Sequence, residues 1–490
     1  MRAGRLTNSH KAMNHHPLPN PLRPALATAL LATLLLGACA VGPNYQRPTA
    51  PDVSSFKEAE GWVPAAPADA LERGAWWALF GDPVLDQLAA SVEVSNQNVA
   101  AAVAAYAQAR ALVAQQRASL FPTVTLNGGA NRSHSGSGSS AGVASGGRTG
   151  DSYQLSMGGS WEPDVWGRLG RAVAGASAGA QASAADLASA RLSAQGQLAV
   201  NYLSLRQTDA QKALLESTIA GYLRTLEITQ NRYNAGIVAK TDVLQSQTQL
   251  ANAQADQAGL VRQRAQLEHA VAVLTGQAPG NFSLAPAVWN PTVPDVPVGV
   301  PSTLLQRRPD IAAAERRVAV ANEQIGIARS AYYPALSLGA SYGLGASSVA
   351  DLFSASSSVW SFGLSAAQTL FNAGATRARV QGSEAAHAQA VASYRQTVLG
   401  AFQGVEDQLA ATRVLLIQQD LRRQASQAAD QVEQQVLNRY RSGLVSYTDV
   451  ITAQATALNA RRALVQSMAD RQTTAVALIQ SLGGGWQAGQ

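Results

Sequence analysis

Four short segments of the chain alternate between large apolar and small polar residues with a period of two. They are residues 123–127, 153–161, 336–344 and 360–366. In the second segment, for example, Gln and Ser separate Tyr153, Leu155 and Met157. This alternation predicts half-buried β-strands. Ser-rich loops at residues 131–151 and 346–358 divide the four strands into two predicted hairpins.

The two faces of these strands differ, because one is large and apolar and the other is almost entirely Ser and Gly. A soluble sheet could bury the apolar face under helices, whereas a transmembrane barrel would turn it toward lipid. The helical stretch at residues 167–232 would be about 100 Å long, too long to fold back over so short a strand. We therefore favour the barrel. Open sheet edges do not occur in lipid, so four strands must be completed by a second chain, giving eight strands, or by two more, giving twelve.

Long proline-free stretches surround a proline-rich connector. The proline-free stretches are residues 84–121, 164–278 and 335–490. Outside the predicted strands they are rich in Ala, Gln, Leu and Arg, which are good helix formers. Residues 279–309 contain seven Pro residues and are expected to be extended. Leu260, Leu267 and Leu274 recur at a spacing of seven, which is typical of a coiled-coil seam.

One seventeen-residue pattern occurs twice, 207 residues apart, with nine identities. The identical positions are Asn231, Arg232, Tyr233, Gly236, Val238, Thr241, Asp242, Val243 and Gln247 in the first copy, and Asn438, Arg439, Tyr440, Gly443, Val445, Thr448, Asp449, Val450 and Gln454 in the second. The repeat indicates two structurally equivalent halves. Gly236 and Gly443 suit the left-handed position that ends a helix, and the Thr-Asp pairs suit the start of the next helix. Each half is therefore predicted to be a long helical hairpin with this motif at its tip.

The N-terminus reads as a secretory signal peptide. Residues 1–24 carry four basic residues and no acid, and the apolar run at 25–36 is too short to span a bilayer. Small residues then precede Cys39, the only cysteine of the chain, which fits a bacterial lipoprotein site bearing diacylglycerol and palmitate. The alternative is a small buried cysteine near an ordinary cleavage site. Ala40 after the cysteine favours the outer membrane over the inner one. Translation starts at Met1 or Met13.

These boundaries divide the chain into six parts. They are a signal peptide at 1–38, a lipidated extended segment at 39–82, a first structural repeat at 83–278, a Pro-rich linker at 279–308, a second repeat at 309–486 and a tail at 487–490.

Charge and motif content exclude several classes of function. Without the signal peptide, 33 basic residues face 31 acidic ones, so the net charge of +2 gives no argument for nucleic-acid binding. Gly138, Ser140 and Gly142 match a GxSxG elbow, but no strand or helix is predicted around them. The sequence contains no P-loop, no HExxH and no cysteine cluster. We expect neither an enzyme nor a bound metal or cofactor.

Several ordered segments resemble one family. They are Cys39-Gly42-Pro43-Tyr45-Pro48, Trp76-Trp77-Phe80-Asp82-Leu85, Trp161-Glu162-Asp164-Trp166-Gly167-Arg168, Pro301-Leu304-Leu305-Arg307-Arg308-Pro309-Asp310, Ala314-Glu315-Arg316-Ala321-Asn322 and Leu482-Gly483-Gly484-Gly485-Trp486. In this order they resemble the outer membrane factor family of TolC-like channels, and within it the NodT-type lipoproteins.

The resemblance implies an internally duplicated α+β membrane protein. Three copies would share a twelve-stranded β-barrel in the outer membrane, and their helical hairpins would form a periplasmic α-barrel. A periplasmic adaptor and a proton-driven inner-membrane pump would deliver drugs or other small toxic solutes to this passive duct. The alternatives are a type I protein-secretion duct with an ATP-driven partner, and a pore-less coiled-coil periplasmic adaptor.

The resemblance also places the gate at the hairpin tips. Asp242 and Asp449 would bring six carboxylates to the pore axis of a trimer, where they attract cations; alternatively, both are first-turn helix acids. Tyr233 and Tyr440 match positions that constrict the tip by hydrogen bonds, or they pack in the core. Val445 and Thr452 stand where some relatives carry a gate Arg and a second ring acid.

The remaining candidates concern docking and packing. Four tip residues are expected to contact the adaptor, or simply to join the helices: Gly236, Val238, Gly443 and Val445. Arg307, Arg308 and Asp310 are expected to cap the first helix of the second half. Trp76 and Trp77 are expected to anchor packing rather than bind a ligand.

Overall fold

The computed structural model of the 490-residue chain describes residues 40–49, 55–58, 73–135, 139–140, 143–144, 148–294, 296 and 308–484. The predictions for the signal peptide, Cys39, Arg307 and the tail at 487–490 lie outside these residues, as do Gly138 and Gly142. The described part falls into two units. One comprises residues 40–42, 120–171 and 326–376, and the other comprises the remaining residues. We call them the strand unit and the helical unit.

The helices and strands follow one another in the order expected from the sequence. The helices are η2 Arg73–Phe80, α2 Pro83–Ser95, α3 Gln97–Ala118, α4 Arg168–Asn234, α5 Lys240–Leu274, η3 Pro279–Asn281, α7 Pro309–Ser330, η4 Ala355–Ser357, α8 Ala375–Arg441 and α9 Tyr447–Ser481. The strands are β1 Thr123–Ser135, β2 Ser139–Ser140, β3 Val143–Ala144, β4 Arg148–Trp161, β5 Ala335–Ala346 and β6 Ser358–Ala367. None of the described helices combines the length and apolarity needed to cross a bilayer.

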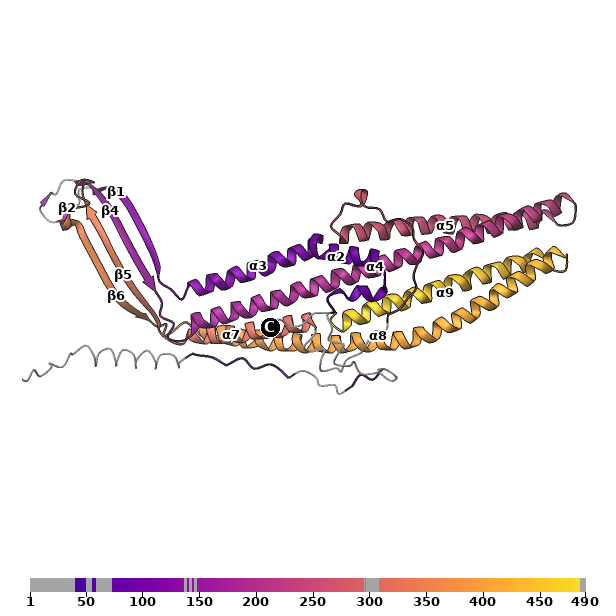
Figure 1. Ribbon diagram of the computed structural model, residues 1–490. Helices are drawn as coiled ribbons and strands as arrows, with labels where there is room; N and C mark the ends of the chain where they lie inside the picture. The colour runs from indigo at the N-terminus through magenta and orange to yellow at the C-terminus, as the bar shows by residue number, and fades with distance from the viewer. Residues whose placement is uncertain are drawn as a thin grey trace, which may run out of the picture. The chain divides into compact units, whose positions relative to one another are not determined.

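The strand unit is built on one antiparallel sheet with the order β1-β4-β5-β6 (Figure 1). The register aligns the predicted apolar faces of all four strands, since residues directly opposite one another share a face. One such row is Leu126, Met157, Tyr342 and Trp360, and the row beside it on the other face is Thr125, Gly158, Ser341 and Ser361. The sheet therefore has one large apolar face and one face of small polar residues, as predicted.

The first hairpin is longer than the sequence indicates. A loop was expected over residues 131–151, but β1 continues to Ser135 and β4 already begins at Arg148. These ends carry no apolar alternation and pair through polar contacts instead. The Arg132 guanidinium lies 3.5 Å from the Asp151 carboxylate, and Nδ1 of the His134 ring lies 2.9 Å from the Thr149 hydroxyl. The period-two pattern thus marks only the part of the hairpin that has two chemically different faces.

Two helical hairpins of equal dimensions dominate the helical unit and lie side by side (Figure 1). α4 and α8 each have 67 residues, and α5 and α9 each have 35. The predicted turn glycines occupy left-handed backbone conformations, with φ of 72° at Gly236 and 76° at Gly443. The backbone bonds of the two turns match as well, because Ile237 donates to Arg232 and Leu444 donates to Arg439, both at 2.9 Å. This is the bond pattern of a Schellman helix end.

The main hydrophobic core of the helical unit lies where its N-terminal helices meet the long hairpins. Trp76 and Trp77 pack edge to face at 5.9 Å, and both are buried among side chains from α2, α4 and α8. The expectation that this pair anchors packing is confirmed. A second cluster lies further along the first hairpin, where Leu260 of the predicted seam is buried with Tyr222 and Leu458.

A buried polar network fixes the connector between the two halves. Arg206 donates to Asp209 at 3.1 Å, and Arg264 donates to the other oxygen of the same carboxylate at 2.7 Å. The two guanidinium groups also donate to the carbonyl oxygens of Ala285 and Leu284 in the connector. A buried charge is tolerated only when its partners are complete, and here three charged side chains satisfy one another. The sequence gives no periodic signal for this network.

Arg308 joins the beginning of α7 to the end of α9. Its guanidinium donates twice to Asp310, at 2.7 and 3.0 Å, and once to the carbonyl oxygen of Ser481 at 2.8 Å. Asp310 in turn accepts the backbone N–H of Ile311. Of the predicted capping residues, Asp310 accepts an N–H of the first turn of α7. Arg308 has no acceptor, so it holds the Asp310 carboxylate and satisfies a carbonyl at the C-terminus of α9 instead.

Candidate functional site

The two predicted gate carboxylates stand in different surroundings at the hairpin tips. Asp449 forms a capping box with Ser446: its carboxylate accepts the Ser446 N–H at 3.0 Å and the hydroxyl at 2.7 Å. The equivalent helix α5 begins after Ala239, which offers no side-chain cap, and Asp242 is half-buried in its first turn. Asp449 therefore acts as a first-turn helix acid, as the alternative interpretation expects. Its carboxylate is also exposed at the tip, so the two roles are compatible.

The two tyrosines of the repeated motif also differ. Tyr440 is 3% exposed, whereas Tyr233 is 39% exposed. The Tyr440 ring lies 5.5 Å from the ring of Tyr447, and its hydroxyl lies 3.4 Å from that of Thr229 on α4. Tyr440 thus belongs to a small apolar core at the tip of the second hairpin and contacts α4 through Thr229, while Tyr233 presents its ring to the surface.

Arg232 completes this junction. Its guanidinium lies 4.8 Å from the centre of the Tyr440 ring and donates to the Tyr440 carbonyl oxygen at 2.6 Å. Both interactions connect the first hairpin to the second, and a cation over an aromatic ring is attracted to the electron-rich face. Sequence reasoning found the Asn-Arg-Tyr motif but assigned no role to its arginine. The available signal was the recurrence of Arg232 as Arg439 beside each tyrosine.

Burial raises the pKa of the Tyr447 hydroxyl, which is the largest effect on this group, and a hydrogen bond with Ser246 opposes the rise. The negative charge of Asp242 adds a smaller upward contribution. The contributions of Tyr440 and Tyr222 come before that of Asp242, so Asp242 has only a minor effect on the pKa of this hydroxyl.

The predicted docking residues surround two exposed apolar side chains. Gly236 and Gly443 hold the positive φ angles of the turns, so the helix-joint role applies to both. Val238 and Val445 are half-buried. Between each glycine and valine stands one large exposed residue, Ile237 at 63% and Leu444 at 70% exposure. Sequence reasoning missed these two, although they occupy equivalent positions of the repeat and differ only in side-chain branching.

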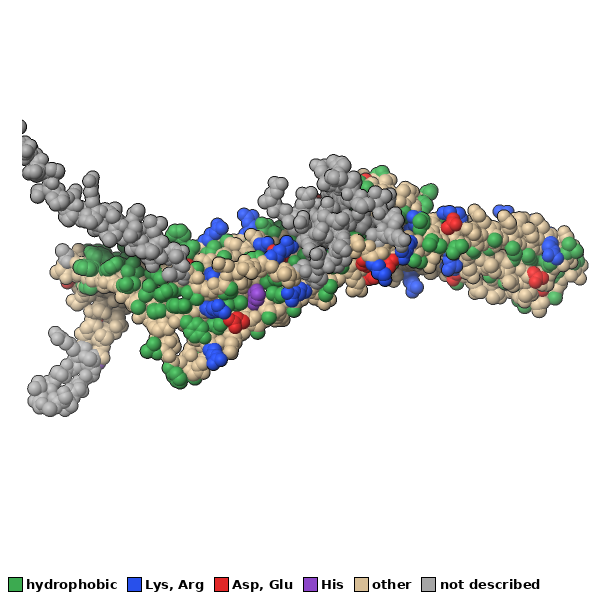
Figure 2. All heavy atoms as spheres, turned by 90° about the horizontal axis from the view of Figure 1, so that it is seen from below, with side chains coloured by type: hydrophobic (Ala, Val, Ile, Leu, Met, Phe, Trp, Pro, Cys, Tyr) green, Lys and Arg blue, Asp and Glu red, His purple; other side chains and the backbone are tan. Residues whose placement is uncertain are grey.

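The strand unit exposes its apolar face. Phe362, Trp360 and Leu126 are 68%, 74% and 71% exposed, and green hydrophobic side chains gather in this part of the molecule in Figure 2. The expectation that helices bury this face in a soluble protein is therefore not met. On the opposite face the hydroxyls of Ser341 and Ser361 bond to one another at 2.7 Å.

Aromatic side chains collect at one end of the sheet, where β1 and β5 begin and β4 and β6 end. Trp161 donates its indole N–H to the Leu120 carbonyl at 2.9 Å. Phe121 and Phe371 flank the strands and are 69% and 86% exposed. Tyr and Trp favour the boundary between lipid and water, where an apolar ring and a polar tip are both accommodated. This arrangement is typical of the aromatic girdle of a membrane barrel.

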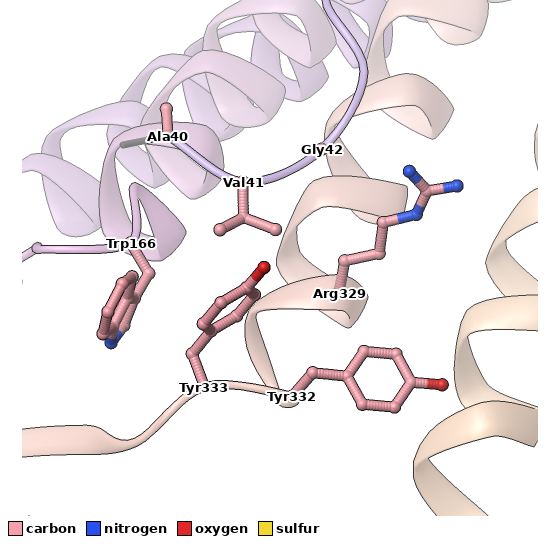
Figure 3. Close-up of a pocket in the computed structure, with 7 residues that line it drawn as sticks. All are labelled: Ala40, Val41, Gly42, Trp166, Arg329, Tyr332 and Tyr333. Atoms are coloured by element: carbon pink, nitrogen blue, oxygen red, sulfur yellow. The ribbon is translucent and has the colours of Figure 1, made fainter. Parts of the chain in front are cut away.

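A pocket of about 650 Å³ lies at the same end, beside the first described residues of the chain (Figure 3). Val41 donates its N–H to the Trp166 carbonyl at 3.0 Å, and the Trp166 ring stacks on Tyr333 at 4.8 Å. A Cβ atom on Gly42 would lie 2.5 Å from the Cα of Gly326, so only glycine allows this close approach. These contacts fix the segment that directly follows Cys39 in sequence.

Within the described residues no group of His, Cys, Asp and Glu side chains could hold a metal ion.

Known proteins share this architecture over nearly the whole chain. The chain is 31% identical over 474 residues to the probable efflux pump outer membrane protein TtgC of Pseudomonas putida, covering 95% of this chain and 97% of that one. It is 30% identical over 466 residues to the outer membrane protein OprJ of Pseudomonas aeruginosa, covering 94% and 96%. The outer-membrane channel OprN superposes with a TM-score of 0.83 at 29% identity, over 92% of this chain and 100% of that one.

The family model for outer membrane efflux proteins matches residues 88–277 and again residues 300–484. These two stretches contain all the tip residues described above and all four strands of the main sheet. The chain therefore belongs to the outer membrane efflux protein family.

Proposed function

We propose that three copies of this chain form a passive exit duct in the outer membrane, through which an inner-membrane pump discharges small toxic solutes. The observation that carries the proposal is the four-stranded sheet, whose apolar face is exposed and whose edge strands β1 and β6 each have one side without a partner strand among the described residues. Lipid does not tolerate unpaired backbone groups, so the edges must be completed by other copies. Three sheets give the twelve strands that the resemblance implies, with the face of Ser and Gly lining the lumen.

The helical unit supports association of copies. Three large apolar residues on one face of α8 lie within two turns and are 45–59% exposed: Val414, Ile417 and Leu421. Apolar side chains gathered in this way on a surface mark a site of association. In the proposed trimer, α8 of one copy packs against a neighbouring copy, and the six hairpins surround a continuous tunnel. The equal lengths of the two hairpins suit such a ring, because each copy contributes two hairpins of similar size to its wall.

The partners follow from the passive nature of the duct. The chain has no nucleotide-binding motif, so the energy for transport must come from elsewhere. We propose that a periplasmic adaptor binds the hairpin tips, where Ile237 and Leu444 offer exposed apolar contacts on either hairpin. The adaptor would connect the duct to a proton-driven inner-membrane transporter.

The substrate class is proposed from relatives. Two Pseudomonas putida proteins, each 30–31% identical to this chain, are described as a toluene efflux pump outer membrane protein and an antibiotic efflux pump outer membrane protein. We extend this to drugs, solvents or comparable small toxic solutes for the present chain. A type I protein-secretion duct would use the same architecture with an ATP-driven partner, and remains the second candidate.

The lipoprotein assignment of Cys39 belongs to the same proposal. The described chain starts at Ala40, next to the aromatic end of the sheet, so a lipid on the preceding cysteine would lie at the level expected for the membrane surface. Labelled fatty acid should be incorporated into the wild-type chain and not into Cys39→Ser. Incorporation into the variant would show that Cys39 is not the lipidation site.

Fractionation and single-channel recording test the duct itself. The proposal requires a heat-modifiable oligomer in the outer-membrane fraction that conducts ions in planar bilayers. Recovery as a monomer from the soluble periplasm would instead favour a pore-less adaptor.

A further inference from the structure

The contact between Arg232 and Tyr440 joins two hairpins of one chain. The equivalent pair in the repeat, Arg439 and Tyr233, forms no such contact within the described residues of the chain. Arg232 and Tyr440 belong to different copies of the repeated motif. The related residues are Arg439 and Tyr233, each displaced by 207 positions. Within the chain, Arg232 donates to the Tyr440 carbonyl and lies over its ring. Arg439 and Tyr233 are both exposed. Tyr233 directly follows Arg232 and Arg439 directly precedes Tyr440 in sequence.

The exposure of the two tyrosines shows what is missing. Tyr440, which has its arginine, is 3% exposed, whereas Tyr233 is 39% exposed. Both stand in the last turn of a 67-residue helix and both accept the N–H of the turn glycine, at 2.8 Å from Gly236 and 2.9 Å from Gly443. The local backbone is therefore the same. The difference lies in the surroundings of the two rings. Tyr440 is covered by Tyr447 of its own hairpin and by Arg232 and Thr229 of the first hairpin.

We propose that Arg439 of one copy lies over the Tyr233 ring of the next copy and donates to its backbone carbonyl. Around the ring of hairpin tips, Arg232–Tyr440 contacts within copies would then alternate with Arg439–Tyr233 contacts between copies. The proposal rests on the proposed function, since it requires copies arranged in a closed ring. The step from the first hairpin to the second within a copy brings Arg232 to Tyr440. The same step from the second hairpin to the first hairpin of the next copy brings Arg439 to Tyr233. Such head-to-tail contacts close a ring when the rotation is regular.

The two contacts are not equally supported by their surroundings. Thr229, whose hydroxyl meets that of Tyr440, is replaced by Val436 at the related position. Tyr447, whose ring packs on Tyr440, is replaced by Lys240. The contact between copies therefore lacks one hydroxyl partner and one aromatic neighbour, and it places a second cation near the same ring. The contact between copies is therefore supported by fewer neighbours than the contact within a copy.

Cross-linking of introduced cysteines tests the contact. The full-length double variant Arg439→Cys/Tyr233→Cys would be treated with a short bismaleimide in outer-membrane vesicles. The expected product is a covalent trimer on a denaturing gel, because every copy then links to both neighbours. The matched pair Arg232→Cys/Tyr440→Cys shows that the reagent can link two residues in this kind of contact. It should give only internally linked monomers. The single variant Tyr233→Cys should give no covalent trimer.

Two failures are distinguishable. An oligomer that forms but yields no covalent trimer, while the internal pair reacts, would overturn the contact and leave the duct standing. A chain that is monomeric before cross-linking would overturn the duct together with the contact. If cysteine variants assemble poorly, the variants Arg439→Ala and Tyr233→Leu supply a second measurement. Each should lower the temperature at which the oligomer dissociates, and the double variant should lower it by no more than the larger single effect. Full additivity would contradict the proposal.

Discussion

Ser446 and Asp449 form reciprocal hydrogen bonds at the start of α9. At the equivalent position of α5 stands Ala239, which has no side-chain hydroxyl, so Asp242 cannot form the same pair. The structural role of Asp449 can therefore be separated from its charge. Ser446→Ala removes a cap and keeps the carboxylate, whereas Asp449→Asn removes the charge and keeps an oxygen that accepts the Ser446 N–H. The cap is worth about 0.5–2 kcal/mol of stability.

If the tip carboxylates select ions, the double variant Asp242→Asn/Asp449→Asn should lower the cation preference of the channel, because up to six negative charges leave the trimer axis. Ser446→Ala should lower thermal stability and leave ion preference as it is. Single-channel reversal potentials in a salt gradient measure the preference. Unchanged potentials in the double variant would reduce both residues to first-turn helix acids.

Loss of Arg232 should loosen the tip within each copy. A hydrogen bond from a charged donor is worth about 1.5–3 kcal/mol, and the cation over the Tyr440 ring adds about 0.5–1 kcal/mol. Arg232→Ala should therefore raise single-channel conductance and make the tip turns more sensitive to protease. Arg224→Ala, an exposed arginine on the same helix, is the matched control and should change neither. Equal effects of both variants would assign the change to lost surface charge.

The Tyr202 hydroxyl provides a pH-dependent test of the buried polar network. It donates to Asp82 at 2.6 Å and accepts from Arg206 at 3.0 Å. Burial, followed by the hydrogen bond to Asp82, raises the Tyr202 pKa to about 12 from its ordinary value of 10.0. The unfolded chain therefore releases this proton first as the pH rises. The stability that the protonated hydroxyl contributes is complete below pH 10 and is lost between pH 10 and about 12.

Tyr202→Phe should accordingly be destabilised by about 1–3 kcal/mol at pH 8, since the buried Arg206 and the half-buried Asp82 both lose a partner. The difference from wild type should shrink as the pH rises above 10. Thermal unfolding in detergent across this range measures it, with Tyr106→Phe on α3 as the control. A difference that stays constant from pH 8 to 11.5 would show that the hydroxyl does not titrate as described.

Neighbouring residues of β6 test which face of the sheet meets lipid. Phe362→Arg places a charge on the apolar face, at a cost of about 2–4 kcal/mol near the middle of a bilayer. It should reduce assembly into the outer membrane. Ser361→Arg places the same charge on the opposite face and should permit assembly while reducing cation conductance. Normal assembly of Phe362→Arg with failed assembly of Ser361→Arg would reverse the assignment of the two faces.

The sequence predicted the hairpins well because their boundaries are set by local chemistry. Gly236 and Gly443 end α4 and α8 through positive φ angles. The period-two alternation located the centres of β5 and β6, the beginning of β1 and the end of β4. Both signals lie within a few residues of the feature that they mark, so neither required knowledge of the neighbouring elements.

The different burial of the two motif tyrosines could not be predicted from such local signals. Tyr233 and Tyr440 are each preceded by Asn-Arg and followed three residues later by glycine, and their burial depends on positions that differ between the two copies. Thr229 and Tyr447 surround Tyr440, whereas the related positions hold Val436 and Lys240. The ends of the first strand hairpin were missed for a comparable reason, since cross-strand polar pairs leave no periodic trace in a single sequence.

The most direct test of the account is the accumulation of a panel of drugs, dyes, solvents and metal ions in cells with and without this chain, beside a blot of their membrane fractions. An efflux duct predicts broad extra accumulation in cells that lack the chain, reversal on re-expression, and the protein in the outer membrane. Unchanged accumulation across the panel, with a secreted protein retained in the deletion cells, would contradict efflux and identify the duct as a route for protein secretion.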